Sequence, residues 1–360
     1  MQKQALLVSF AAGLASALLF AGLIAQTQGG AFLTFLAPLP IFIASLGWGS
    51  RAGFIAVVVA ALAVILSSGS MLVSVPLVVA MAGPAAWIGH LAGLARPAGP
   101  EDARTGVPPL DWYPLSRILM GICLMAILGC VILGWMIGFN AQDFGPELAN
   151  AFTASGTFST EDEAQLRELT ALAVRIIPFV QPALLVALLT FMLYLAAVIT
   201  RASGRLNRPR DDIPSQAGLP RVALPIFAVA LAVSFFGGVV GTVAAVVCGA
   251  FGMAFTMVGL AAMHRRTRTM SGRGLILFSA YAAIFLLSIP LFAFLIIGLV
   301  DVAKAVAAQT GSPRWIFGVR FGGPAIRGGG LVPVDPDVVT STTLDGWLAG
   351  RESTNAGERR

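Results

Sequence analysis

Five ionisable side chains lie beside long apolar stretches of this chain, and their positions limit the chemistry available there. They are His90, Arg117, Arg175, His264 and Asp301, and each stands near the end of a stretch. Proton- and sodium-coupled transporters keep ionisable residues in mid-membrane, because charge movement is their mechanism. Metal hydrolases need paired His, Asp or Glu, and the stretches contain no such pair, no GxSxG motif and no Walker lysine motif. The sequence therefore predicts no catalytic residue, no metal site and no cofactor, and we do not expect an enzyme.

Nine apolar stretches account for most of the chain. They run over residues 5–25, 31–48, 52–68, 71–95, 115–139, 175–199, 221–237, 239–263 and 274–300. About 20 apolar residues cross the ~30 Å hydrocarbon core of a bilayer as a helix. Hydrophobic residues make up 57% of the chain and charged residues only 11%, where a soluble protein carries about 25% charged residues. We therefore expect an all-α fold, a polytopic integral membrane helical bundle of about nine transmembrane helices.

One pair of stretches leaves an alternative open. Only Gly237 and Gly238 separate stretch 221–237 from stretch 239–263. Residues 221–263 therefore form either two spans or one span plus a re-entrant hairpin.

The cationic residues indicate an orientation. With the N-terminus in the cytoplasm, the inward loops and their flanks hold 14 Lys and Arg, whereas the outward loops hold two, Arg167 and Arg175. This positive-inside bias predicts a multi-pass protein of the bacterial inner membrane with a cytoplasmic N-terminus. It also explains the net charge of +6 without nucleic acid as a partner. The tail after Asp301 should then lie outside, unless the last stretch bends back near Pro290.

Two regions follow from this layout. Residues 1–301 form the transmembrane domain, and residues 302–360 form a polar tail that we expect to be largely disordered. Within the domain, the outer loop 140–174 is acidic in its second half. Thr160 and Glu163 fit a capping box there, which predicts an amphipathic helix on the outer face.

The few polar residues near the outer loop are candidates for binding a small molecule. Gln181 lies between two prolines in stretch 175–199, Asn140 and Trp135 lie at the end of stretch 115–139, and Arg175 is on the same side. Together they could outline an outward-facing pocket beneath the amphipathic helix. The alternative is that Gln181 and Asn140 form hydrogen bonds between helices.

The first stretch carries a face of small residues. Gly13, Ala17 and Ala21 recur every fourth position, a spacing that lets another helix approach closely. This face could dock a separate membrane coupling partner, or it could pack against another helix of the same protein.

Several short motifs give the chain a resemblance to a known family. They are Ala37-Pro38-Leu39-Pro40, Gly47-Trp48-Gly49-Ser50-Arg51-Ala52-Gly53, Gln181-Pro182, Leu219-Pro220-Arg221, Gly259-Leu260-Ala261-Ala262-Met263-His264 and Gly298-Leu299-Val300-Asp301. In their order and spacing over residues 5–301 the chain resembles the YybS-like family of bacterial multi-spanning proteins, whose function is unknown. That family is distantly similar to the substrate-binding membrane components of energy-coupling-factor transporters. The resemblance implies capture of a small molecule and docking of a coupling partner through the first span. Fold-level kinship does not determine function.

Two functions therefore stand side by side. The first is a small-solute-binding uptake component that works with a separate energising partner, which would account for the absence of mid-membrane charge. The alternative is a non-transporting scaffold or assembly factor whose basic cytoplasmic linkers contact anionic lipid or a cytoplasmic complex. The lipid bilayer is the one partner that both share.

Overall fold

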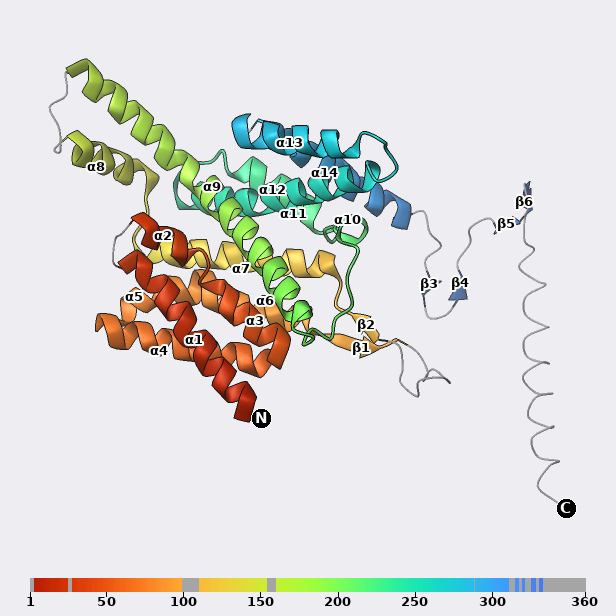
Figure 1. The fold of residues 1–360 in the computed structure, drawn as a ribbon. Coiled ribbons are helices and arrows are strands. Elements are labelled where there is room, and N and C mark those ends of the chain that lie inside the picture. The colour runs from red at the N-terminus through yellow and green to blue at the C-terminus, as the bar shows by residue number, and fades with distance from the viewer. Residues whose placement is uncertain are drawn as a thin grey trace. The chain divides into compact units, whose positions relative to one another are not determined.

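The structure is a computed structural model of the 360-residue chain and is almost entirely helical. The part of the chain that it describes comprises residues 3–24, 28–98, 110–153, 160–287, 289–310, 315–316, 319–320, 325–327 and 330–332. The chain divides into two compact units, Met1–Ala305 and Val306–Arg360. Figure 1 shows the first unit as a bundle of helices crossed by the long helix α9.

The first unit contains fourteen α-helices, one π-helical segment and one small hairpin within the described ranges. In chain order the helices are α1 (Lys3–Ile24), α2 (Gln28–Thr34), α3 (Pro38–Trp48), α4 (Ser50–Ser68), α5 (Met71–Pro76), the π-helix η1 (Leu77–Ala82), α6 (Gly83–Ala92), α7 (Leu115–Met136), α8 (Ala141–Thr153), α9 (Thr160–Ala202), α10 (Ile213–Gln216), α11 (Ala223–Val233), α12 (Gly238–Arg266), α13 (Arg273–Leu287) and α14 (Pro290–Thr310). Strands β1 (Ala95–Pro97) and β2 (Leu110–Trp112) pair antiparallel between α6 and α7.

Six helical segments of the described chain are long and apolar enough to cross a membrane. They are Lys3–Leu23, Ser50–Ser68, Met71–Ala92, Leu115–Met136, Ala164–Ala202 and Gly238–Arg266. Each corresponds to one of the nine predicted stretches. The all-α prediction therefore agrees with the structure, whereas the count of nine spans is not confirmed.

The other three predicted stretches form shorter helices, and prolines explain two of them. Residues 35–37 form a turn between α2 and α3, and α3 begins at Pro38. The stretch 274–300 is likewise two helices, because α13 ends at Leu287 and α14 begins at Pro290. Proline disfavours a helical conformation in the residue before it but is well accommodated in the first turn of a helix.

The third short segment is α11, which has 11 residues. At 1.5 Å per residue it is about 16 Å long, roughly half the thickness of the hydrocarbon core. Residues 234–237 connect it to α12, whose first residue, Gly238, has a φ of 74° that favours glycine. A segment this short next to a long helix is closer to the re-entrant alternative than to a second full span.

Glycines allow the helices of the first unit to touch backbone to backbone. A β-carbon added to Gly13 of α1 would lie 2.6 Å from the carbonyl oxygen of Ala56 in α4. On α12, one added to Gly249 would overlap the carbonyl of Phe179 in α9. This is the close packing of small residues that replaces the hydrophobic effect between helices in lipid.

The C-terminal helix of this unit folds back onto α12. A β-carbon on Gly259 of α12 would overlap the Phe294 carbonyl of α14, and one on Gly298 of α14 would overlap the Phe255 carbonyl of α12. Asp301 consequently lies 2.7 Å from Arg265, at the C-terminal end of α12. This packing agrees with the alternative that the last stretch bends back near Pro290, and the side on which the tail lies stays a prediction.

The second unit includes two short antiparallel hairpins. Strands β3 (Trp315–Ile316) and β4 (Val319–Arg320) form one, and β5 (Ala325–Arg327) and β6 (Gly330–Val332) form the other. The remaining residues of the predicted disordered tail, from 333 to 360, lie outside the described residues.

Candidate functional site

The four predicted binding residues are exposed on the bundle surface. Trp135 is 84% exposed, and the side chains of Asn140, Arg175 and Gln181 are also exposed. The backbone carbonyl of Asn140 accepts a hydrogen bond from Phe144 as α8 begins. The structure therefore places these residues at the surface, and a pocket among them stays a prediction.

The sequence predicts a separate amphipathic helix in the acidic loop, and the structure has a helix there that is not separate. It is the first part of the 43-residue helix α9 and continues directly into the apolar segment. Helix α8, which the sequence reading missed, packs against it, with Ala149 of α8 and Val174 of α9 fully buried. A β-carbon on Gly145 of α8 would lie 3.3 Å from the Ala171 Cα of α9. Two helices, α8 and the start of α9, thus pack together in this acidic region, and its place at a membrane surface stays a prediction.

The small-residue face of α1 contacts the chain's own helix α4. Gly13 lies against Ala56 and Val59, and Ala17 is only 8% exposed. Ala21, one turn further along, is half-buried. These residues are therefore occupied by packing within the protein.

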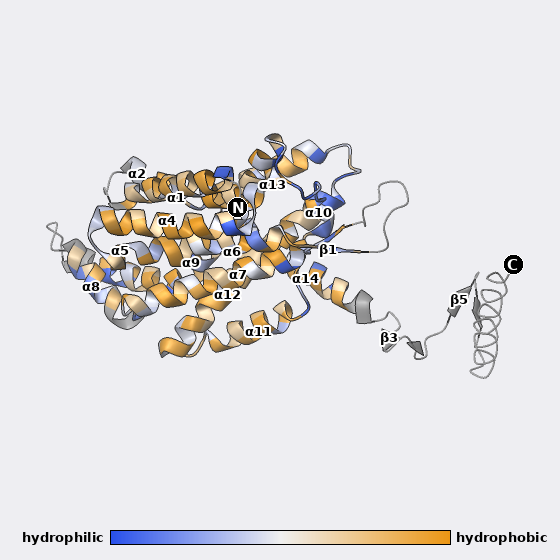
Figure 2. Ribbon diagram, turned by 90° about the horizontal axis from the view of Figure 1, so that it is seen from below, coloured by the Kyte–Doolittle hydropathy of each residue, from blue (hydrophilic) through white to orange (hydrophobic). Residues whose placement is uncertain are grey.

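Polar residues gather instead at the end of the bundle where the predicted inward loops meet. We call this the linker end and define it by residues 45–51, 90–98, 110–114, 203–216 and 264–272. In Figure 2 the hydrophilic residues around α10 and β1 mark this end, while the neighbouring helices are mostly hydrophobic. The linker end contains a cleft of about 480 Å³. Its lining comprises Ala5, Ser45, Leu46, Gly47, Trp48, Gly49, Ser50, Ala92, Gly93, Trp112, Arg205, Leu206, Asn207 and Arg208.

Two turns position the walls of this cleft. Helix α3 ends at Trp48, and Gly49, with a φ of 91°, connects it directly to α4 at Ser50. Helix α9 ends in a Schellman arrangement, in which Gly204 has a φ of 66° and the Arg205 amide donates to the Thr200 carbonyl at 3.0 Å. Both turns need a glycine at positive φ. They place Trp48 and Arg205 on facing walls.

The guanidinium of Arg205 lies over the indole ring of Trp48, 4.6 Å from its centroid. This is the geometry of a cation–π contact, which leaves the N–H groups of the guanidinium available to a ligand. The indole Nε1 of Trp48 is buried and has no hydrogen-bond partner among the described residues.

Ser45 forms the buried side of the cleft. Its side chain is 3% exposed and lies between two glycines. A β-carbon added to Gly53 would lie 2.8 Å from Ser45 Cβ, and one added to Gly89 would lie 2.7 Å from it. The hydroxyl oxygen has no hydrogen-bond partner within the described ranges. Leaving a buried polar group unpaired costs about 1–3 kcal/mol, so Ser45 and Trp48 are unusual residues to find together in one cleft.

Arg208 fastens the linker to the bundle below the cleft. It is 8% exposed, pairs with Asp211 at 2.7 Å, and donates to the carbonyls of Ala92 at 3.2 Å and Tyr113 at 3.0 Å. Its charge and donors are thus used within the protein. Arg208 holds the wall in place, and we assign it no ligand.

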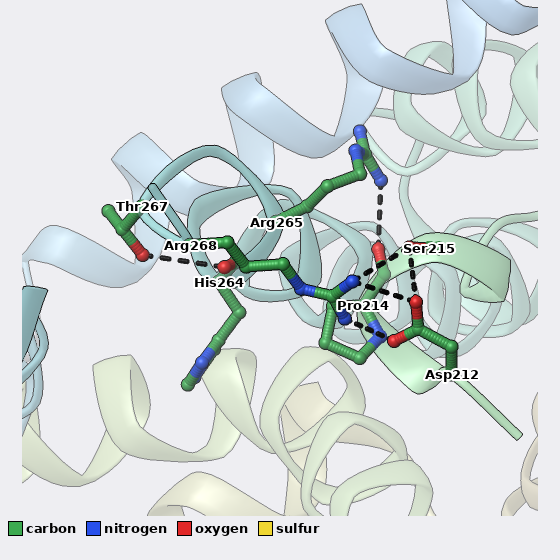
Figure 3. A network of polar contacts seen from close by, with 7 residues as sticks. All are labelled: Asp212, Pro214, Ser215, His264, Arg265, Thr267 and Arg268. Carbon is green, nitrogen blue, oxygen red and sulfur yellow. Dashed lines mark hydrogen bonds and ion pairs between the residues drawn. The ribbon is translucent and has the colours of Figure 1, made fainter. Parts of the chain in front are cut away.

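A second network holds the far side of the linker (Figure 3). Arg268, just after α12, binds both carboxylate oxygens of Asp212, and Arg265 donates to the Pro214 carbonyl at 2.9 Å. The hydrogen bonds from Arg268 and Ser215 lower the pKa of the Asp212 carboxyl to about 2. The linker that carries Arg205 is therefore attached to the bundle on one side by the hydrogen bonds of Arg208 to Ala92 and Tyr113, and on the other side by the Arg268–Asp212 ion pair.

Among the described residues, no group of three His, Cys, Asp or Glu side chains could hold a metal ion. A larger hollow of about 690 Å³ lies between α11 and α12, but its lining residues are all apolar. That lining suits lipid chains better than a polar solute.

Comparison of the chain with protein-family models, with curated proteins and with solved structures finds no match. The resemblance to YybS-like proteins therefore stays a prediction. The sequence reading missed Ser45, Trp48 and Arg205 as a group. The available signal was the run Gly47-Trp48-Gly49-Ser50, in which a tryptophan and a serine flank a glycine at the end of an apolar stretch.

Proposed function

We propose that this chain is a multi-pass bacterial inner-membrane protein that binds a small solute in the linker-end cleft. One observation carries the proposal: a cleft of about 480 Å³ is lined by Ser45 and Trp48, and the Oγ and Nε1 atoms of these residues are buried and without a partner among the described residues. A protein that bound nothing there would bear the cost of both unpaired groups without gain. The linker end is the cytoplasmic end in this proposal, because it holds the predicted inward loops and their arginines.

Transport of the solute would depend on a separate energising partner. The apolar segments that could span the membrane carry their ionisable residues near their ends, among them His90, Arg117 and Arg266. These segments contain no carboxylate in their middle, which is the kind of residue that couples transport to a proton or a sodium ion. The proposal also includes the resemblance to YybS-like proteins. It counts the three shorter apolar helices as additional membrane segments.

The scaffold alternative receives less support. Arg208, Arg265 and Arg268 make their contacts within the chain, so fewer linker cations remain for an outside complex. It becomes the better explanation if the purified protein carries no solute and is isolated with a cytoplasmic complex.

The test compares the same substitution at the two ends of the bundle. The full-length protein and its Trp48→Ala and Trp135→Ala variants are purified in mild detergent and examined by native mass spectrometry. We expect a bound small molecule in the wild type and in Trp135→Ala, and its loss in Trp48→Ala. Loss in Trp135→Ala alone would overturn the cleft and favour the outward-facing pocket predicted from the sequence.

A further inference from the structure

The unpaired groups of the linker-end cleft share one property, which is that they can donate hydrogen bonds. An indole N–H and a guanidinium are donors only, and a serine hydroxyl can donate as well as accept. Arg205 is exposed to the cleft, and a ligand that also pairs with the buried Trp48 and Ser45 donors after a small shift of their side chains must present several acceptor oxygens. From this we infer that the cleft binds the phosphate group of a small phosphorylated molecule or of a phospholipid. The inference rests on the proposed function, since it names the ligand class of the same cleft.

The charge balance of the cleft supports an anion. Its lining contains two arginines and no acidic residue. Asp211 neutralises Arg208, and Arg268 neutralises Asp212, the next carboxylate along the linker. Among the described residues no carboxylate lies within ion-pair distance of Arg205. One positive charge is thus left uncompensated at the cleft.

The shape and depth of the cleft favour phosphate over a bare halide or a simple carboxylate. Donors line it at different depths, from the exposed Arg205 to the buried Ser45. A phosphate group offers three or more oxygens to such a set, whereas a carboxylate offers two. The volume of about 480 Å³ exceeds what a bare phosphate needs, and the Trp48 and Trp112 rings provide apolar surface for the rest of the molecule.

Two sources could supply this phosphate group. The cleft lies at the end of the apolar helices, where a bilayer presents its headgroups, so the phosphate of a lipid could enter it. A soluble phosphorylated metabolite could reach it from the aqueous side. The chemistry of recognition is the same in both cases.

The experiment uses one probe for each source. Full-length protein in a non-ionic detergent is titrated by calorimetry with glycerol 3-phosphate and, separately, with dihexanoyl phosphatidic acid; glycerol and dihexanoyl glycerol are the phosphate-free controls. We expect at least one phosphate probe to bind, and Arg205→Gln to weaken it about tenfold or more through loss of a charge-assisted contact. The matched variant Arg210→Gln removes the same charge from an exposed linker position outside the lining and should leave the affinity unchanged. Trp48→Phe keeps the ring but removes the N–H, and should weaken binding several-fold.

Each outcome decides a different point. Binding of phosphatidic acid alone, sensitive to Arg205→Gln, supports the phosphate site and overturns small-solute uptake. Binding of glycerol 3-phosphate with the same sensitivity supports both. Equal effects of Arg205→Gln and Arg210→Gln overturn the inference, because the attraction would then be non-specific. Absence of phosphate binding at roughly millimolar concentration also overturns it, while a different solute found in the cleft by mass spectrometry would leave the proposed function standing.

Discussion

Replacing Gly298 with alanine should destabilise the protein, because Gly298 is where α14 lies directly on the backbone of α12. The added β-carbon would be 2.7 Å from the Phe255 carbonyl carbon and 3.0 Å from the Gly259 amide nitrogen, besides overlapping the Phe255 oxygen. These are backbone atoms of a regular helix, so they cannot rotate away and the two helices must separate. Overpacking of this kind costs about 1–3 kcal/mol. Because the added β-carbon overlaps the Phe255 carbonyl, we expect Gly298→Ala to lower the free energy of unfolding by an amount near the upper end of this range.

A second glycine provides the matched control. Gly274, the second residue of α13, has nothing within 4 Å of its β-carbon position, so alanine there meets no overlap and gains at most the helix propensity of about 1 kcal/mol. Propensity favours alanine at both positions, and at least as much at Gly298 inside α14, so a lower free energy of unfolding in Gly298→Ala than in Gly274→Ala reports the helix contact. Unfolding of the full-length protein by sodium dodecyl sulfate in mixed micelles, followed by tryptophan fluorescence, measures both values. Equal stabilities of Gly298→Ala and Gly274→Ala would refute the folded-back position of α14.

Three further predictions follow from the packing and the linker network. Gly13→Leu should lower stability by about 3 kcal/mol or more by forcing α1 away from Ala56 in α4, seen as a lower melting temperature in detergent with no added partner. Arg208→Gln should cost about 3 kcal/mol, because it leaves the largely buried Asp211 unpaired, and unfolding in mixed micelles measures the loss. The pKa of Asp212 is lowered to about 2, so the stability that its carboxylate gives to the linker is complete above the ordinary pKa of 3.8 and is lost as the pH falls through about 2. Limited proteolysis of the linker should therefore be unchanged between pH 5 and 8. Asp212→Asn should accelerate cleavage at neutral pH.

The helices that cross the bundle could be predicted from the sequence because hydropathy alone determines them. The stretch 52–68 became α4 (Ser50–Ser68), and 115–139 became α7 (Leu115–Met136). Hydropathy failed where a proline divided an apolar run, at Pro38 and Pro290, because a window average does not register a single broken hydrogen bond. It also failed for α8, whose mixed composition resembles a polar loop until α9 covers its apolar side.

The candidate site could not be predicted for a different reason. Arg205 and Arg208 looked alike in the sequence, as two of many arginines in an inward linker. The structure separates them, because Arg208 is buried against Asp211 and two carbonyls, while Arg205 is stacked on a tryptophan from the other half of the chain. Only the tertiary fold brings Trp48 and Ser45 to that linker. The outward candidates were selected because they were rare polar residues, and rarity does not reveal exposure.

The ion pairs of the linker end explain why Arg205 is the arginine of the cleft lining that keeps no carboxylate partner among the described residues. A charge in the hydrocarbon region is costly, so this chain keeps its ionisable groups at the helix ends, where water and opposite charges can reach them. Arg208, Arg265 and Arg268 each meet an aspartate, namely Asp211, Asp301 and Asp212. The Arg268–Asp212 pair fixes the linker to the end of α12, the Arg265–Asp301 pair fixes α14 to α12, and the Arg208–Asp211 pair lies within the linker. The uncompensated charge of Arg205 then lies on the face of Trp48, in a cleft that Ser45 also lines. In our proposal, this charge of the cleft selects an anionic ligand over the phosphate-free probes.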